Sequence, residues 1–277
     1  MKKYITIVLI LLSATLTFAQ KKEKIKGSKL VTVEHREIGD FKELVVEDNL
    51  EVYLERGERA ELKVEADDNL HAIISLDLSD NILRVSTTKQ AINYNKIVVR
   101  ITYTKDLNLI TSKDGSTVNA IQELLLNTIT LKAHDASKLF VNVNTKDFLL
   151  EADDKSKTEL NLKSENTIIE LSKNASLKGL INTTDLKMNL YKNSDATLEG
   201  TAINTIIKLD NKATFTGNRF TTKNADITTE NFSSCSLFTE TTVIIDAANK
   251  SEIQLVGSPK IEIRKFADEA KLIKKLK

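Results

Sequence analysis

Apolar and polar residues alternate with a period of two through residues 105–262, and the alternation recurs in a short repeat. Each repeat contains a small residue, Ser or Ala, that we call the anchor. The anchors are Ser116, Ser137, Ser156, Ala175, Ala196, Ala213, Ser233 and Ser251. The differences between successive anchor numbers are 21, 19, 19, 21, 17, 20 and 18. A period of two indicates a strand with one buried face, whereas a helix would place its apolar residues three or four apart.

Three columns of apolar residues accompany the anchors. The residue six before each anchor is Ile or Leu: Ile110, Leu131, Leu150, Ile169, Leu190, Ile207, Ile227 and Ile245. The residue two after each is apolar except Thr158: Val118, Leu139, Leu177, Leu198, Phe215, Cys235 and Ile253. Four after each stand Ala120, Val141, Leu160, Gly179, Gly200, Gly217, Leu237 and Leu255. The positions one and three after the anchor are polar, except for Phe140.

A short unit that cannot bury its own apolar face is typical of a stacked repeat protein. The sequence therefore predicts an all-β fold, a parallel β-solenoid (β-helix-like) of about eight coils. With a strand spacing of about 4.8 Å, eight coils form a rod of roughly 40 Å. Leu131, Leu150 and Ile169 should then be in successive contact, with parallel pairing between their strands. An antiparallel sandwich is the alternative, but it does not require like residues to align at a fixed period.

Each anchor is expected at a tight corner, where a larger side chain would collide with its copy one coil away. The steps between anchors are uneven, and we assign the extra residues to turns such as Thr201–Asn204.

Residues 30–104 show longer alternating segments, for example Leu50 to Leu54 and Ile97 to Tyr103. Turn-forming residues stand between them, as at Ser79-Asp80-Asn81. We interpret this segment as an N-terminal β segment that caps or begins the solenoid and protects its first edge from pairing with another chain.

The two ends of the chain have their own character. Residues 1–19 have the features of a signal peptide: Lys2 and Lys3, an apolar stretch, and small residues at Thr17 and Ala19. Residues 20–29 form a polar linker. Residues 263–277 form a charged cap or tail, in which Lys271 to Lys277 fits a short amphipathic helix or a frayed end.

The charge of the chain is balanced, with 40 Lys and Arg against 39 Asp and Glu, and removal of Lys2 and Lys3 leaves a net charge of −1. This balance argues against nucleic acid, which requires a basic face, and against attachment to anionic lipid. No membrane span is expected after signal cleavage.

The single cysteine, Cys235, cannot form an intrachain disulfide. Because Cys235 stands in an apolar column, we expect it to pack in the core as a small buried hydrophobic residue. With no tryptophan, a sugar cleft of stacked Trp is excluded.

The sequence provides few residues for chemistry, and we expect no catalytic residues, no cofactor and no metal site. His35, His71 and His134 lack a second His or Cys at metal-ligand spacing. One constellation remains: Asp114, Asp135 and Asp154 stand two before the anchor in three consecutive coils.

Stacked carboxylates about 5 Å apart suit a retaining glycosidase or a cation such as calcium, and their repulsion would raise at least one pKa. Turn preference alone also explains this column, because Asn211, Asn231 and Asn249 continue it after Lys173 and Ser194.

Several short motifs follow one another along most of the chain. They are Phe41, Leu44, Val46, Val52, Leu54 and Gly57 in order, then "LKVEADDNL" (62–70), "VRITY" (99–103), "SKDGSTV" (112–118) and "GSPKI" (257–261). In this order they resemble the auto-transporter adhesin head GIN domain family of bacterial envelope proteins. The tripeptide of the family's name is not intact, and Asp48-Asn49-Leu50 is its nearest counterpart. The resemblance implies an exported all-β repeat protein with an adhesin-like role and no established catalytic residues.

From these features we expect a non-enzymatic, exported, adhesin-like or structural β-solenoid that presents a binding surface in the cell envelope. Its location would be the periplasm, the outer cell surface or the medium, and its partner a glycan or an envelope protein. The alternative is a polysaccharide-binding or polysaccharide-cleaving β-helix protein that uses the row of Asp114, Asp135 and Asp154.

Overall fold

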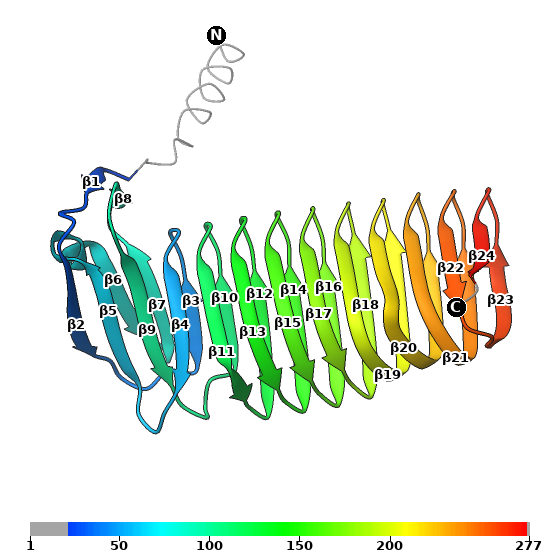
Figure 1. The fold of residues 1–277 in the computed structure, drawn as a ribbon, viewed down its shortest axis with the longest axis horizontal. Coiled ribbons are helices and arrows are strands. Elements are labelled where there is room, and N and C mark those ends of the chain that lie inside the picture. The colour runs from blue at the N-terminus through cyan, green and yellow to red at the C-terminus, as the bar shows by residue number, and fades with distance from the viewer. Residues whose placement is uncertain (1–21, 276–277) are drawn as a thin grey trace, which may run out of the picture.

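The computed structural model describes residues 22–275, which form a long rod of two facing sheets (Figure 1). Sheet I contains, in spatial order, β6 (Ile74–Ser79), β7 (Ile82–Thr87), β3 (Glu43–Val46), β10 (Leu109–Ser112), β12 (Thr128–Ala133), β14 (Asp147–Ala152), β16 (Asn166–Leu171), β18 (Asp185–Tyr191), the second halves of β19 (Asp195–Asp210), β20 (Thr214–Thr229) and β21 (Ser234–Ala247), and β23 (Lys260–Phe266). Each turn of the chain adds one strand to each sheet.

Sheet II faces sheet I across the core. It contains β2 (Val31–Glu37), β5 (Glu61–Asp67), β9 (Ile97–Tyr103), β4 (Glu51–Arg56), β11 (Thr117–Leu125), β13 (Lys138–Asn144), β15 (Lys157–Lys163), β17 (Ser176–Asn182), the first halves of β19, β20 and β21, then β22 (Glu252–Val256) and β24 (Lys271–Lys275). From β10 onward the chain makes about nine turns, so the expected β-solenoid is confirmed.

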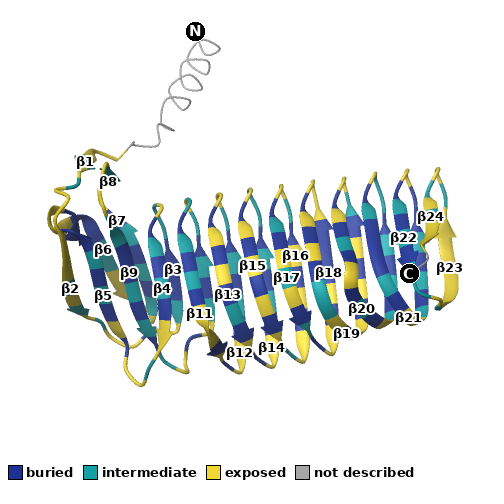
Figure 2. Cartoon of the chain, in the orientation of Figure 1, coloured by how far each residue is buried: buried dark blue, intermediate teal, exposed yellow. Residues whose placement is uncertain are grey.

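Parallel register carries like residues from coil to coil, as the apolar columns predict. Leu131 lies opposite Leu150, and Leu150 lies opposite Ile169. Buried and exposed residues alternate along the strands, so each sheet presents one face to the core and one to solvent (Figure 2). The antiparallel sandwich is excluded for β10 to β24, because every pairing between these strands is parallel.

One predicted anchor position is wrong: the residue at the corner of that coil is Ser194 and not Ala196. Lys192 and Asn193 have positive φ, and Ser194 N–H donates to the Tyr191 carbonyl at 3.2 Å. The column six before the anchor therefore continues from Ile169 to Met188 instead of Leu190. A shift of two residues keeps every side chain on the same face, so alternation alone does not reveal it.

The extra residues of the long steps do not lie in turns, so their assignment to Thr201–Asn204 is wrong. That segment is continuous strand within β19. The long step from Ser116 to Ser137 instead contains a bulge in β11 between Ala120 and Leu124. The long step from Ala213 to Ser233 contains a shift of register in β20 after Thr216.

The corners at the anchors are built from turns whose two central residues both have positive φ, as in type I′ turns. Several buried anchor hydroxyls bond to the preceding coil. Ser116 Oγ donates to the Val46 carbonyl at 2.9 Å, and Ser137 Oγ donates to the Ser112 carbonyl at 2.8 Å. The anchor is therefore small because it is enclosed. In these coils the serine hydroxyl also donates a second hydrogen bond to a carbonyl of the preceding coil that already accepts one from a backbone N–H.

The N-terminal segment folds around the first coils out of chain order. The coil of β3 and β4 is stacked on one side by β7 and β9, which come later in the sequence, and on the other by β10 and β11. Antiparallel pairing occurs only here among the described strands, in β2–β5, β5–β9 and β6–β7, with the 3-10 helix η1 (Asp68–Ile73) between β5 and β6. The segment thus both caps the rod and contributes parallel coils to it.

The two chain ends differ from their expectations in part. Within the linker, β1 (Lys24–Lys26) pairs with β8 (Gln90–Ile92). The helix considered for the C-terminal lysines is wrong, because Lys271–Lys275 is strand β24 and pairs with β22. The predicted signal peptide lies outside the described residues. Within residues 22–275, no helix has the length and apolar character needed to cross a membrane.

Neighbouring core positions compensate for each other in size. With the corrected register, Ala196 lies between Leu177 and Phe215, so the smallest side chain of the column stands beside the largest. Gly217 makes further room, since a Cβ there would lie only 2.6 Å from Phe215 Cε1. The core is therefore close-packed around the Phe215 ring.

We predict that Ala196→Leu lowers the free energy of unfolding by about 1–3 kcal/mol, because the added volume meets Phe215 and Leu177. Urea denaturation measures this change. The control is Thr214→Leu, which adds a leucine at an exposed position of β20 and should leave stability nearly unchanged. Equal stability of Ala196→Leu and the parent chain would contradict the close packing assigned to the core around Phe215.

Candidate functional site

The row of Asp114, Asp135 and Asp154 forms as predicted in three consecutive turns. These residues have φ of 53°, 51° and 47°. The turns are tied together by backbone: Gly115 N–H donates to the Asp135 carbonyl and Ala136 N–H to the Asp154 carbonyl, both at 2.9 Å. Asp and Asn tolerate this left-handed conformation better than most residues, so backbone geometry accounts for the column.

The surroundings of the row vary from turn to turn. Lys173, which follows Asp154 in the column, places Nζ 3.1 Å from Asp154 Oδ2. Partial burial raises the pKa of Asp114; Lys113 opposes this effect and Asp135 adds to it. Within residues 22–275, no group of three or more His, Cys, Asp or Glu side chains is arranged to hold a metal. With Ser194 as anchor, Lys192 and not Ser194 occupies this column.

The cysteine and one histidine, which are reactive residue types, both make contacts within the fold. Cys235 is fully buried between Phe215 and Ile253 in its column, and burial raises the pKa of its thiol to about 12. A thiol with such a pKa stays protonated at neutral pH, as its predicted role in the core requires. His134 Nδ1 lies 2.6 Å from Asp153 Oδ1 in the neighbouring turn.

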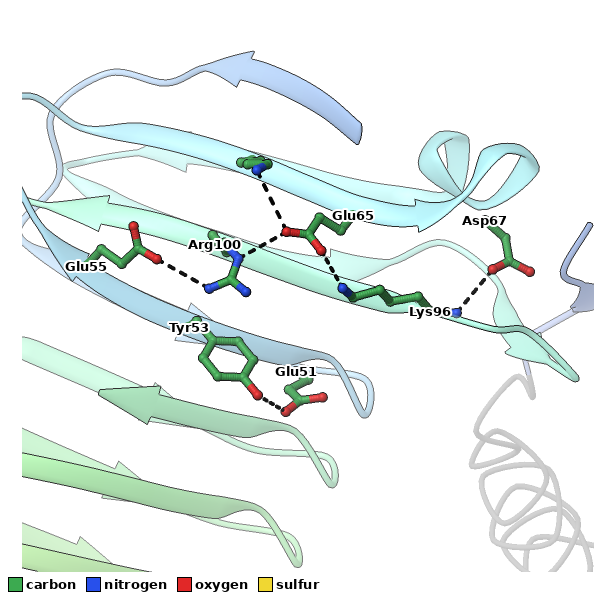
Figure 3. A network of polar contacts seen from close by, with 8 residues as sticks. Glu51, Tyr53, Glu55, Glu65, Asp67, Lys96 and Arg100 are labelled. Carbon is green, nitrogen blue, oxygen red and sulfur yellow. Dashed lines mark hydrogen bonds and ion pairs between the residues drawn. The ribbon is translucent and has the colours of Figure 1, made fainter. Parts of the chain in front are cut away.

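A network of charged residues covers the outer face of sheet II near its N-terminal end (Figure 3). Arg100 bonds Glu65 and Glu55, at 3.2 and 3.3 Å, and its guanidinium lies 5.0 Å from the centre of the Tyr53 ring. Hydrogen bonds from Lys96 and then Arg100 lower the pKa of Glu65. Because these groups satisfy one another across β4, β5 and β9, we assign the network to the stability of the first coils.

Asp67 joins three segments at the same end. Its buried carboxylate accepts backbone N–H bonds from Lys29 at 2.8 Å and from Asn95 and Lys96 at 3.1 Å. Burial raises the pKa of Asp67, but these N–H bonds, first that of Lys29, outweigh it and lower the pKa overall. The carboxylate therefore fixes the entry into β2 and β9 in its ionised form.

A groove of about 710 Å³ lies farther along the outer face of sheet II. It extends over β13, β15, β17 and β19 and is bordered by Ile121 of the bulge in β11 and by Arg219 of β20. Phe140 and Leu180 provide apolar surface, with 37% and 46% of each residue exposed. Polar residues supply the rest of the outward lining, namely Asn142, Glu159, Asn161, Lys178, Thr197 and Glu199.

The groove is not predicted by the sequence pattern. Most of its lining belongs to positions that the alternation assigns to solvent, where Phe140 is only an exception to the polar pattern. The long steps from Ser116 to Ser137 and from Ala213 to Ser233 are the available signal, because the bulges that border the groove contain their extra residues. Bulges are common beside functional sites.

We predict that Asp67→Asn lowers the urea midpoint of unfolding at neutral pH, since an amide cannot replace a carboxylate that accepts N–H bonds on both oxygens. A lowered pKa stabilises the fold above the unfolded value of about 3.9, and this contribution is lost as the pH falls through the lower folded value. The difference in urea midpoint between the parent chain and Asp67→Asn should therefore become smaller below about pH 4. Asp68→Asn, at an exposed neighbour, is the control. A gap that is independent of pH would contradict the assignment.

Known proteins with this fold include two solved structures described as putative adhesins. The one from Parabacteroides merdae is 15% identical, with a TM-score of 0.66, and the match covers 91% of this chain and 99% of that chain. The one from Parabacteroides distasonis is 14% identical, with a TM-score of 0.59, and the match covers 90% and 99%. A third, described as a putative lipid binding protein from the latter organism, is 13% identical, with a TM-score of 0.58, and covers 91% and 100%.

At this identity the structures show a shared fold alone, and none of their descriptions names an enzymatic activity. No curated protein matches the sequence. The family model described as "Putative auto-transporter adhesin, head GIN domain" matches residues 40–259, which is most of the chain and includes the parallel coils up to β22. The chain therefore belongs to the auto-transporter adhesin head GIN domain family.

Proposed function

We propose that the chain is an exported, non-enzymatic, adhesin-like protein that presents the outer face of its solenoid as a binding surface in the cell envelope. Membership of a family described by adhesins supports export and adhesion. The predicted signal peptide supports the same route. The partner would be a glycan or a protein of the envelope.

The groove on sheet II is the observation that carries this proposal. Elsewhere on the outer faces, polar residues often bond to their copies in the next coil: Asn166 Nδ2 donates to Asp147 at 2.7 Å and Asn204 Nδ2 to Asp185 at 2.8 Å. Within the groove, Glu159, Asn161 and Thr197 make no such bond to any described residue. Lys178 makes no side-chain hydrogen bond either, and its charge acts on Asp195, where it opposes the rise in pKa that burial causes. Unpaired polar groups between exposed apolar ones are suited to a ligand.

The non-enzymatic part of the proposal rests on the residues whose side chains could act in catalysis. The Asp row is accounted for by turn geometry, and Cys235 is buried with a raised pKa. The alternative, a polysaccharide-cleaving protein, requires Asp135 to act on a ligand at the turns. That role and a turn role differ in their response to Asp135→Asn, because Asn keeps the preference for positive φ and removes the charge.

We expect a tagged full chain, produced in cells that encode it, to appear in the envelope or the medium with its N-terminus near residue 20. Cell fractionation and N-terminal sequencing measure both. Recovery of chains that retain Met1 in the cytoplasm would contradict export.

The same material, incubated with neutral and acidic polysaccharides with and without calcium, should yield no cleavage products. The matched variant is Asp135→Asn, which should fold as the parent chain does. Turnover by the parent chain that disappears in this variant would favour the enzymatic alternative instead.

A further inference from the structure

We infer that the groove on sheet II binds a neutral, extended oligosaccharide. This inference rests on the proposed function, because it names the ligand class of the same surface. It is carried by the repeat of the groove, the exposed apolar side chains, the unpaired polar groups and the balance of charge.

The groove repeats along the rod axis. Each of the four strands β13, β15, β17 and β19 contributes two outward side chains, and their register pairs Phe140 with Glu159, Glu159 with Lys178 and Lys178 with Thr197. A ligand lying along the axis therefore meets a new pair about every 4.8 Å. This spacing is close to the length of one pyranose ring in an extended chain, so successive sugars can occupy successive coils.

The apolar side chains are separated from one another. Phe140 lies at the β13 end and Leu180 lies two strands away on β17, while Ile121 of the β11 bulge is 72% exposed. The face of an aromatic ring is negative and attracts polarised C–H groups, such as those on the flat side of a pyranose. Apolar contacts interrupted by polar ones suit a sugar better than a continuous acyl chain.

The polar side chains supply the matching hydrogen bonds. Asn161 carries a free amide that both donates and accepts, as hydroxyl groups require. Asn142 is oriented by its bond from Nδ2 to the Ile121 carbonyl at 2.6 Å, which leaves its amide oxygen available. Glu159 and Lys178 are opposite in charge and adjacent in register, yet they form no ion pair with each other.

The charge of the groove favours a neutral ligand. Glu159 and Glu199 balance Lys178 and Arg219, and Arg219 is already paired with Glu199. An acidic polysaccharide would meet carboxylates without a net positive field to offset them.

A peptide strand would add to the edge of a sheet and not to an outer face whose backbone is already paired. A second copy of the chain needs about 800 Å² of matched surface, which the bordering bulge of β11 interrupts.

Isothermal titration calorimetry of the purified chain with cellohexaose and chitohexaose tests the inference, with hexagalacturonate as the acidic comparison. Saturable binding of at least one neutral hexamer is expected, with at least about tenfold weaker binding of the acidic one. Phe140→Thr should weaken binding by roughly tenfold, as expected for loss of an aromatic contact near the upper end of the usual range. Asn161→Ala should weaken it as well. The matched control is Ile168→Thr on the outer face of sheet I, where Ile168 is 39% exposed.

Circular dichroism and urea midpoints equal to those of the parent chain establish that the variants are folded. The inference is overturned if neither neutral hexamer binds, if Phe140→Thr binds as the parent does, or if Ile168→Thr weakens binding equally. Preference for hexagalacturonate also overturns it. These outcomes leave the proposed function standing when the chain is exported, whereas a cytoplasmic chain that binds cellohexaose at Phe140 refutes only the proposed function.

Discussion

The parallel register between coils is the constraint on which the rest of the structure depends. Each residue lies beside the residues at the same position in the coils above and below, so the size of a buried side chain depends on its neighbours in those coils. The corners show this clearly: positive φ at both central residues allows each turn to bond to the next, and the enclosed anchor must be small. In the core, Ala196 and Gly217 leave space that Phe215 fills. Size is balanced across neighbouring coils instead of within each one.

The sequence predicts the fold because this constraint produces a period in the chain. Alternation identifies the strands and the anchors identify the coil length, so the contact of Leu131 with Leu150 follows from the sequence alone. Alternation does not show which small residue lies at the corner of a coil. Ser194 and Ala196 face the same way and are both small and buried. A criterion based on the turn resolves this, because Lys192-Asn193 matches the pair Lys173-Asn174 of the coil before it.

The groove could not be predicted for a related reason. Outward side chains are free of the packing constraint, so they vary without a pattern, and a bulge appears in sequence only as an uneven step. The Asp row is the opposite case. Its regularity suggests a site, but regularity in a solenoid follows from the backbone, which repeats in every coil. In this fold we therefore look for function where the repetition is broken, at Ile121 and Arg219, and for structure where it is kept.

The corrected register is the central claim, and methyl nuclear magnetic resonance tests it most directly. Met188 is the only methionine among the described residues, so its labelled methyl group gives one signal there that a Met188→Leu variant assigns. With isoleucine methyls also labelled, this account predicts cross-relaxation from Met188 to both Ile169 and Ile207, its neighbours in the coils on either side. Absence of cross-relaxation from Met188 to both isoleucines would contradict it.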